Sequence, residues 1–229
     1  MDPESTGQPV PAGDRLKIRR TLTFDQIRAA DPLGEFLVNW ITVDPAKIAT
    51  LQTTLDGASD ERPVQRYLQE NPEILAQALV GGHGRWVIPQ KRLGDRFVPD
   101  FVLGHRWSGP TWEWILVELQ TPALSTPRNR TGQLFTRQGR MGEQLDEGLK
   151  QINEWRRWLE ANLDYARRSR TEHGLGLTRI GANPPGLLLI GREGDLTPEH
   201  ADMRKQLGDQ HNVRIHSYNW LVRRTTIGG

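Results

Sequence analysis

The order of the predicted elements favours a mixed α/β fold in which one central sheet lies between helices. Hydrophobic periodicity predicts a helix, three strands, a helix, a strand, a helix and a last strand, in this order. The 229 residues, 36% of them hydrophobic, can fill the core of one large domain with a small extension. The chain has no cysteine, which excludes disulfides and thiolate chemistry.

The first part of the chain is predicted to be a tail and a small appendage. Residues 1–13 are rich in proline, glycine and polar residues, so we expect a disordered tail. Residues 14–58 form the N-terminal appendage, with a strand over 15–24 and a helix that begins at Asp44 with Pro45 in its first position. No apolar run approaches the roughly 18 residues of a membrane span, and the N-terminus does not resemble a signal peptide. We therefore expect a cytoplasmic protein without a membrane partner.

The main domain is predicted to span residues 59–229. A helix over 59–79 is expected to bend near Pro72, and it places Glu61 and Gln65, four residues apart, on one face. Strands over 86–93 and 96–103 flank Gly94-Asp95, which indicates a hairpin, and a third strand covers 112–120. For the tryptophans of this region, packing is favoured over stacking on nucleic-acid bases.

Two acidic residues stand in the middle of these apolar strands. Asp100 alternates with Val98 and Val102, and Glu118 lies between Leu116 and Gln120, so each acid shares a face with its second neighbours. If the two faces coincide, two carboxylates converge beside a glutamine. Burying such carboxylates is costly without a cation, and two oxygen ligands with open positions suit Mg²⁺ or Mn²⁺. The alternative is that each acid pairs with a nearby arginine.

These residues carry a resemblance to a known family. Pro99-Asp100, followed on the next strand by Glu118-Leu119-Gln120, resembles the PD-(D/E)XK nuclease signature, with Gln120 in the position where lysine is most frequent. The order of ERPVQRYLQENPEIL, PQKRLGDRFVPDFVL, LVELQTP, QINEW, GLLLIGR and VRIHSYNWLV resembles the nuclease domain of the Shedu anti-phage defence proteins. The resemblance implies a restriction-endonuclease-like core and a metal-dependent DNA endonuclease that works as a homo-oligomer, with a tetramer expected.

The resemblance also implies roles for individual residues. Asp100 and Glu118 would hold the metal and Gln120 would orient water or a ligand. Glu61 is a candidate third metal ligand, because related nucleases can carry a glutamate on the first helix, although an acid in the first turn of a helix is also favourable by itself. Gln65 would support the site from the same helix face. Gln151, four residues before Trp155, resembles the Gln-x-x-x-Tyr pattern of RecB-like nucleases.

A basic loop follows the third strand. Residues 122–142 contain no acid and include four arginines, Arg128, Arg130, Arg137 and Arg140. Arginines in such a loop, close to a carboxylate site, suit the phosphate backbone of DNA. An ordinary solvated surface loop is the alternative.

The last elements complete the predicted sheet. A long amphipathic helix is expected from Leu145 to about Arg170, then a buried strand over 186–191. Thr197 is expected to cap a helix that runs to about Gln210, and a last strand covers 213–222.

The substitution at Gln120 leaves open which residue supplies a cation. Of the five lysines, Lys91 and Lys150 belong to the elements that build the site. A two-residue turn at Gly94-Asp95 would pair Lys91 with Val98 and place it diagonally from Asp100. A slip of one residue would turn Lys91 to the opposite face, and an edge-strand lysine that discourages aggregation is the alternative reading. A neutral Gln120 also keeps a second function open, namely a catalytically inactive nuclease-fold protein that binds nucleic acid or mediates assembly.

Overall fold

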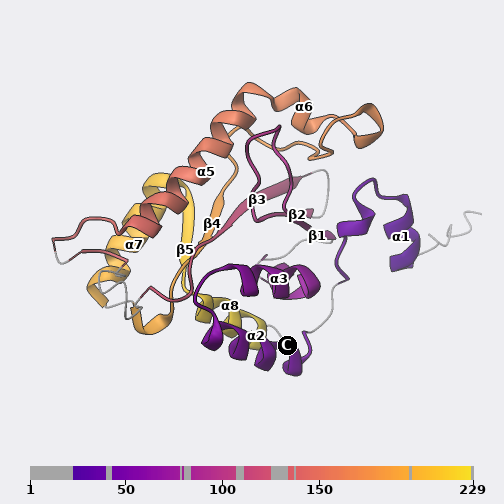
Figure 1. Cartoon of the computed structure of the whole chain (residues 1–229). Helices are drawn as coiled ribbons and strands as arrows, with labels where there is room; N and C mark the ends of the chain where they lie inside the picture. The colour runs from indigo at the N-terminus through magenta and orange to yellow at the C-terminus, as the bar shows by residue number, and fades with distance from the viewer. Residues whose placement is uncertain are drawn as a thin grey trace, which may run out of the picture.

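A mixed five-stranded sheet organises the part of the chain that the computed structural model describes, residues 23–39, 43–77, 79, 84–106, 111–124, 134–136, 138–195 and 198–227. The strands follow the order β1 (Gly84–Pro89), β2 (Phe101–Arg106), β3 (Trp112–Leu119), β4 (Gly186–Leu189) and β5 (Val213–His216). The first three are antiparallel, whereas β3, β4 and β5 are parallel. Helices cover both faces (Figure 1), which confirms the predicted mixed α/β architecture.

One face of the sheet is covered by α5 (Glu143–Ala161) and, near β5, by α7 (Pro198–His211). The long helix predicted to reach Arg170 is shorter than expected. Asn162 ends it, because its backbone leaves helical geometry, and a second helix, α6 (Leu163–Arg167), follows. A short 3₁₀ turn over Arg170–Glu172 comes next.

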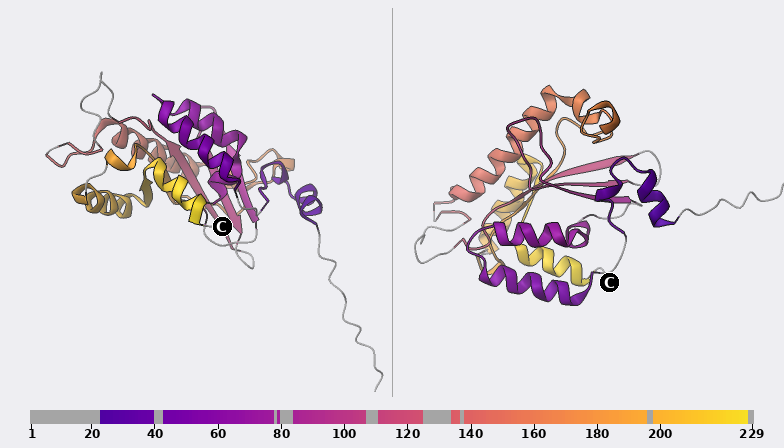
Figure 2. Two further views of the ribbon diagram at one scale, coloured as in Figure 1. Left: turned by 90° about the horizontal axis from the view of Figure 1, so that it is seen from below. Right: turned by 45° about the vertical axis from the view of Figure 1, so that its right-hand side comes forward.

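Of the described helices, four lie on the opposite face: α2 (Pro45–Gly57), α3 (Arg62–Glu70), α4 (Pro72–Ala76) and α8 (Tyr218–Ile227). The right-hand view of Figure 2 shows α2, α3 and α8 together below the sheet. The Asp44 side chain caps α2 by accepting from the Ala46 N–H at 2.9 Å, as predicted. The predicted bend at Pro72 is the break at Asn71 between α3 and α4, because proline cannot supply the helical N–H bond.

Alternation along the strands divides the core into two layers. On the α5 side the buried strand residues include Val102, Leu116, Leu188 and Ile215. On the α3 and α8 side they include Phe101, Leu103, Val117, Leu119, Leu187 and Leu189. The sheet is thus buried on both faces, which is typical of strands that lie between helix layers.

The described part of the N-terminal segment packs against these layers. It consists of α1 (Phe24–Ala30), capped by Thr23, and a 3₁₀ turn over Gly34–Phe36. Leu37 bridges to Trp86, and the Val38 N–H donates to the Arg85 carbonyl at 2.8 Å, so this segment covers the outer edge of β1. The predicted tail over 1–13 and most of the strand predicted over 15–24 lie outside the described residues, and Phe24 begins a helix.

The prediction of a last strand over 213–222 is wrong in its second half. β5 ends at His216 and α8 begins at Tyr218. Tyr218 and Leu221 are fully buried three residues apart, and Thr225 is buried one turn further on, which is helical spacing. A short apolar run of this kind fits both the period of a strand and the period of a helix. Packing against α2 stabilises the helix.

The described tryptophans of the sheet pack together, as predicted. The Trp86 ring stacks on Trp112 with centroids 4.6 Å apart, and Trp112 stacks on Trp114 at 5.8 Å. Trp86 and Trp114 are buried, so their rings are part of the hydrophobic core. Among the described helices, none combines the length and the apolar content that crossing a membrane requires.

Candidate active site

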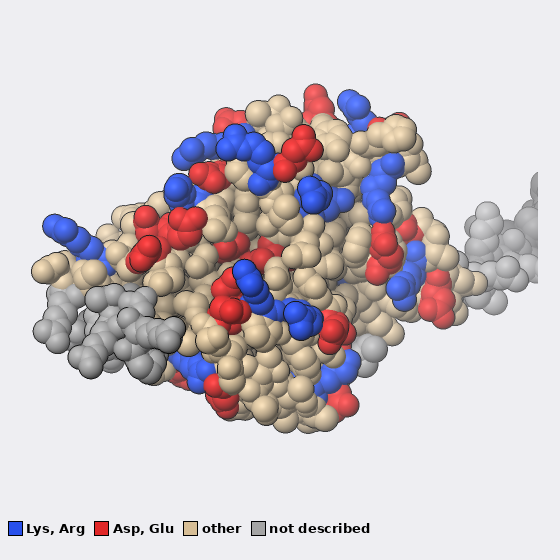
Figure 3. All heavy atoms as spheres, viewed as in Figure 1, with Lys and Arg blue, Asp and Glu red and all other residues tan. Residues whose placement is uncertain are grey.

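A polar cavity of about 400 Å³ opens where β2 begins and β3 ends. It lies between α3 and α5, at the carboxyl end of the parallel strands, where α/β sheets commonly bind ligands. Its described lining consists mainly of acids and amides: Glu61, Arg62, Gln65, Gln90, Val98, Asp100, Glu118, Leu119, Gln120, Glu147 and Gln151. On the face of the molecule in Figure 3, acidic side chains gather in the middle of the view with basic side chains beside them.

Asp100 is held by two donors from different elements. One carboxylate oxygen accepts from the backbone N–H of Leu119 at 2.7 Å, and the other accepts from the side-chain amide of Gln65 on α3. The Gln90 N–H bonds to the Asp100 carbonyl at 2.9 Å, which fixes its backbone against the end of β1. Val98 and Asp100 face the cavity together, as the predicted alternation requires.

Glu118 is surrounded by side-chain amides. Gln120 donates to one of its oxygens at 3.0 Å. Gln151, with its amide turned so that the nitrogen faces the carboxylate, donates to the two oxygens at 2.5 and 3.2 Å. The Gln120 carbonyl in turn accepts from the fully buried Tyr218 hydroxyl at 2.7 Å, which anchors the end of β3 to α8.

The two carboxyl groups lie in surroundings that disfavour their charged forms. Burial raises the pKa of Asp100 to about 6, against the lowering effect of the Leu119 N–H and with a further increase from the charge of Glu61. Burial, followed by the charge of Asp100, raises the pKa of Glu118 well above its usual value. The alternative that each acid pairs with an arginine is not what the described contacts show, because the donors recorded for both are amides.

Glu61 lines the same cavity but does not form a close cluster with Asp100 and Glu118. It precedes the first residue of α3, and its charge acts on Asp100 and Glu118. Within the described ranges, no three Asp, Glu or His side chains come together closely enough to hold one metal ion between them. The structure therefore brings together Asp100 and Glu118 as the possible protein carboxylate ligands and leaves Glu61 further out.

The expected position of Lys91 is wrong. The isolated bridge joins Leu93 to Phe97, and β1 pairs Pro89 with Phe101, so the register differs by one residue from the expected pairing of Pro89 with Asp100. The turn contains three residues, with Gly94 at φ +66°, instead of two.

Lys91 lies beyond β1, which ends at Pro89, and Gln90, at φ +44°, interrupts the alternation of side chains before Lys91 is reached. Lys91 is not part of the described lining of the polar cavity. The side chain is half-buried, and the charges of Arg170 and Glu35 act on it. Burial, and then the charge of Arg170, lowers the pKa of Lys91.

The basic loop is described only in part. Arg128, Arg130 and Arg137 lie outside the described residues. Arg140 is exposed in a short segment that packs on α7, where the Phe135 ring lies 5.3 Å from the His200 ring. The described end of the loop leads directly into α5, the helix that carries Gln151.

Sequence reasoning missed three residues that line the cavity, namely Arg62, Gln90 and Glu147. Glu147 precedes Gln151 by one helical turn, so the predicted helix already placed the two on one face. Gln90 follows from the correct register, which sets it beside Asp100. The position of Arg62 next to Glu61, a candidate metal ligand, could have drawn attention to it. By pattern alone, however, an arginine in the first turn of a helix is an ordinary surface residue.

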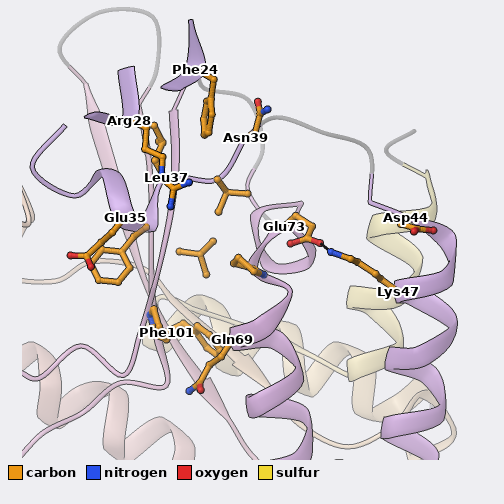
Figure 4. A pocket seen from close by; sticks show the side chains of 15 residues that line it. Phe24, Arg28, Glu35, Leu37, Asn39, Asp44, Lys47, Gln69, Glu73 and Phe101 are labelled. Atoms are coloured by element: carbon orange, nitrogen blue, oxygen red, sulfur yellow. Dashed lines mark hydrogen bonds and ion pairs between the residues drawn. The ribbon is translucent and has the colours of Figure 1, made fainter. Parts of the chain in front are cut away.

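A larger cavity of about 720 Å³ lies elsewhere, between the N-terminal segment, α2, α4 and β1 (Figure 4). Its lining mixes apolar side chains such as Leu37 and Phe101 with an ion pair between Lys47 and Glu73. The paired charges neutralise each other, and the carboxylates of the polar cavity are not part of its described lining.

Most of the chain is similar to a known protein family. No curated protein matches the chain. The model of the family described as "Shedu protein SduA, C-terminal" matches residues 58–222, which is more than half of the chain and includes every described residue that lines the polar cavity. The chain therefore belongs to the Shedu SduA family, through its C-terminal domain.

Proposed function

We propose that this chain is a metal-dependent DNA endonuclease with a PD-(D/E)XK core that acts in Shedu-type anti-phage defence. The observation that carries the proposal is the convergence of Asp100, just before β2, and Glu118, in β3, into one polar cavity, with amides as their donors. Membership of the Shedu family supports the defence role.

The residues of the cavity fit a hard divalent cation. Asp100 and Glu118 are largely buried, and their pKa values are raised, so a cation between them would relieve the cost of burying both charges. Carboxylate oxygens with room for water are the ligands that Mg²⁺ and Mn²⁺ prefer. Bound there, Mg²⁺ would polarise the scissile phosphate and lower the pKa of the attacking water.

The remaining residues have defined tasks in this proposal. Gln65 and the Leu119 N–H hold the Asp100 carboxylate in place, and Gln120 and Gln151 do the same for Glu118. Oriented carboxylates matter because catalysis of phosphoryl transfer depends mainly on positioning and charge. Arginines of the 122–142 loop would bind the phosphate backbone on either side of the cut. A homo-oligomer, expected as a tetramer, belongs to the same proposal through the family resemblance.

Incubation of the purified chain with linear and circular DNA, in Mg²⁺ and in EDTA, tests the proposal. We expect cleavage in Mg²⁺ that EDTA abolishes and that Asp100→Asn or Glu118→Gln removes while DNA binding is retained. Cleavage at the wild-type rate by the Asp100→Asn, Glu118→Gln double variant would overturn the assignment of the site. Light scattering of the same samples measures the oligomeric state.

A second function is favoured by one observation, the engagement of the neutral Gln120 amide with Glu118. An amide lacks the positive charge that lysine contributes to the developing phosphate charge. A nuclease-fold protein that binds DNA without cutting it would bind the same substrates in Mg²⁺ and leave them intact. The cleavage assay separates the two functions directly.

A further inference from the structure

We infer that Arg62, at the first residue of α3, contacts the phosphate at the cut site and supplies the positive charge that Gln120 does not. The inference rests on the proposed function and adds a residue to its site. It starts from the charge balance of the polar cavity and from the position of one guanidinium group in it.

The described lining of the cavity is strongly acidic. It contains four carboxylate side chains, those of Glu61, Asp100, Glu118 and Glu147. A phosphodiester that enters such a cavity meets like charge, and one divalent cation offsets only part of it. A further cation is therefore needed where the phosphate binds.

Arg62 alone carries a positive charge among the cavity-lining residues of the described ranges. Its backbone is fixed, because its N–H donates to the Asp60 side chain at 3.0 Å and begins the helix. Its side chain is exposed, and no hydrogen bond or ion pair of its guanidinium with another described residue is recorded. The helix N-terminus adds a partial positive charge of the same sign.

The other basic candidates are placed less well. Lys91 is half-buried, does not belong to the described lining of the cavity, and is under the influence of the charges of Arg170 and Glu35. Lys150 is exposed on α5 and is not part of the described lining, although Gln151 beside it is. A guanidinium can bridge two phosphate oxygens at once, which suits recognition of a phosphodiester better than an amide does.

The matched control for Arg62 is Arg66, which lies one turn further along α3. Arg66 has the same charge and is also exposed, but it does not line the cavity. A general loss of basic surface would affect both variants alike. A contact at the cut site would affect only Arg62.

The experiment compares wild type, Arg62→Ala, Arg62→Lys and Arg66→Ala. Binding of a 20-base-pair duplex is measured by anisotropy in Ca²⁺, and cleavage of the same duplex is measured in Mg²⁺. We expect Arg62→Ala to lower kcat about a hundredfold, as removal of one charge-stabilising donor typically does, and to weaken binding about tenfold. Arg66→Ala should change either value less than twofold, and Arg62→Lys should fall in between.

Added guanidinium chloride separates a chemical role from a structural one. At millimolar concentration it should restore part of the cleavage by Arg62→Ala and leave Arg66→Ala unchanged. Cleavage and binding by Arg62→Ala at the level of Arg66→Ala would overturn the inference while leaving the proposed function intact. If the wild type does not cleave, the proposed function fails. The binding measurement then decides the inference, and equal affinities of the two alanine variants would overturn it.

Discussion

The backbone N–H of Leu119 donates a 2.7 Å hydrogen bond to the side chain of Asp100. This bond ties the aspartate that precedes β2 to the strand that presents Glu118, so the distance between the two carboxyl groups is fixed by the sheet itself. The Gln120 N–H bonds to the Leu189 carbonyl at 2.9 Å and continues the pairing of β3 with β4 past the site. The two acids are therefore held together before any ligand binds, despite their mutual repulsion.

The first prediction concerns pH and Mg²⁺. The raised pKa of Asp100, about 6, means that the folded protein keeps a proton which the unfolded chain releases near pH 4. The contribution of this group to the free energy of unfolding should therefore fall as the pH rises from about 4 to about 6. Mg²⁺ needs the ionised carboxylates, so its stabilisation should increase with pH across the same window.

Thermal unfolding with and without Mg²⁺, at pH 5 and pH 7.5, checks this prediction. At a Mg²⁺ concentration 100 times Kd, binding contributes about 2.7 kcal/mol, which for a chain of this size raises Tm by roughly 5–10 °C. We expect that increase at pH 7.5 and a smaller one at pH 5. The Asp100→Asn, Glu118→Gln double variant should show neither. The same Mg²⁺ shift in the double variant would place the metal elsewhere.

The second prediction tests the close packing of the tryptophan cluster. A methyl group added at Gly104 would lie 2.5 Å from the Trp114 ring. Gly104→Ala should therefore lower the free energy of unfolding by about 1–3 kcal/mol, as overpacking of a core does. Gly57 at the end of α2 has no atom within 4 Å of the same added group, so Gly57→Ala is the matched control. Urea unfolding of both variants would contradict the packing argument if Gly104→Ala were as stable as the control.

The layers of this fold could be predicted from the sequence, whereas the exact register of its hairpin could not. Alternation of apolar residues assigned Asp100 and Glu118 each to one face of its strand, because successive side chains point to opposite faces. The pattern alone did not decide that these two faces coincide. The one-residue slip at Gly94 could not be predicted in this way, since two-residue and three-residue turns both accept glycine at positive φ. Arg62 reaches the cavity through the tertiary packing of α3, which no local pattern encodes.

The third prediction concerns Lys91. Because Lys91 is not part of the described lining of the polar cavity, Lys91→Ala should leave DNA cleavage within about twofold of wild type. Initial rates in Mg²⁺ measure this directly. A large loss of kcat in Lys91→Ala, without a change in Tm, would show that the lysine reaches the carboxylates in the working enzyme.

The fourth prediction addresses the basic loop. Replacing Arg128, Arg130, Arg137 and Arg140 with serine should weaken duplex binding without regard to sequence, because these residues would contact phosphates. The slope of log K against log salt should become shallower by about 0.9 for each lost contact. Anisotropy titrations between 50 and 200 mM salt measure the slope. An unchanged slope would assign the loop to ordinary solvated surface.

The last prediction concerns Arg156, a buried arginine of α5. Its guanidinium donates to the carbonyl oxygens of Pro184, His211 and Asn212 at 2.7–3.0 Å, and so ties α5 to the segments that lead into β4 and β5. These carbonyls precede the strands, so their position sets how β4 and β5 enter the parallel part of the sheet.

Removing this side chain should be costly, because three carbonyl groups would each lose a donor in a buried place. The Asn212 carbonyl would keep its second donor, the Gly186 N–H at 2.9 Å. Arg156→Leu should lower the free energy of unfolding by about 3 kcal/mol or more. Arg156→Lys should recover only part of it, since one ammonium group cannot reproduce the planar fork. The exposed neighbour Arg157 provides the control, and Arg157→Ala should stay within about 0.5 kcal/mol of wild type in the same urea titration. Equal stability of Arg156→Leu and Arg157→Ala would mean that water replaces the guanidinium without loss.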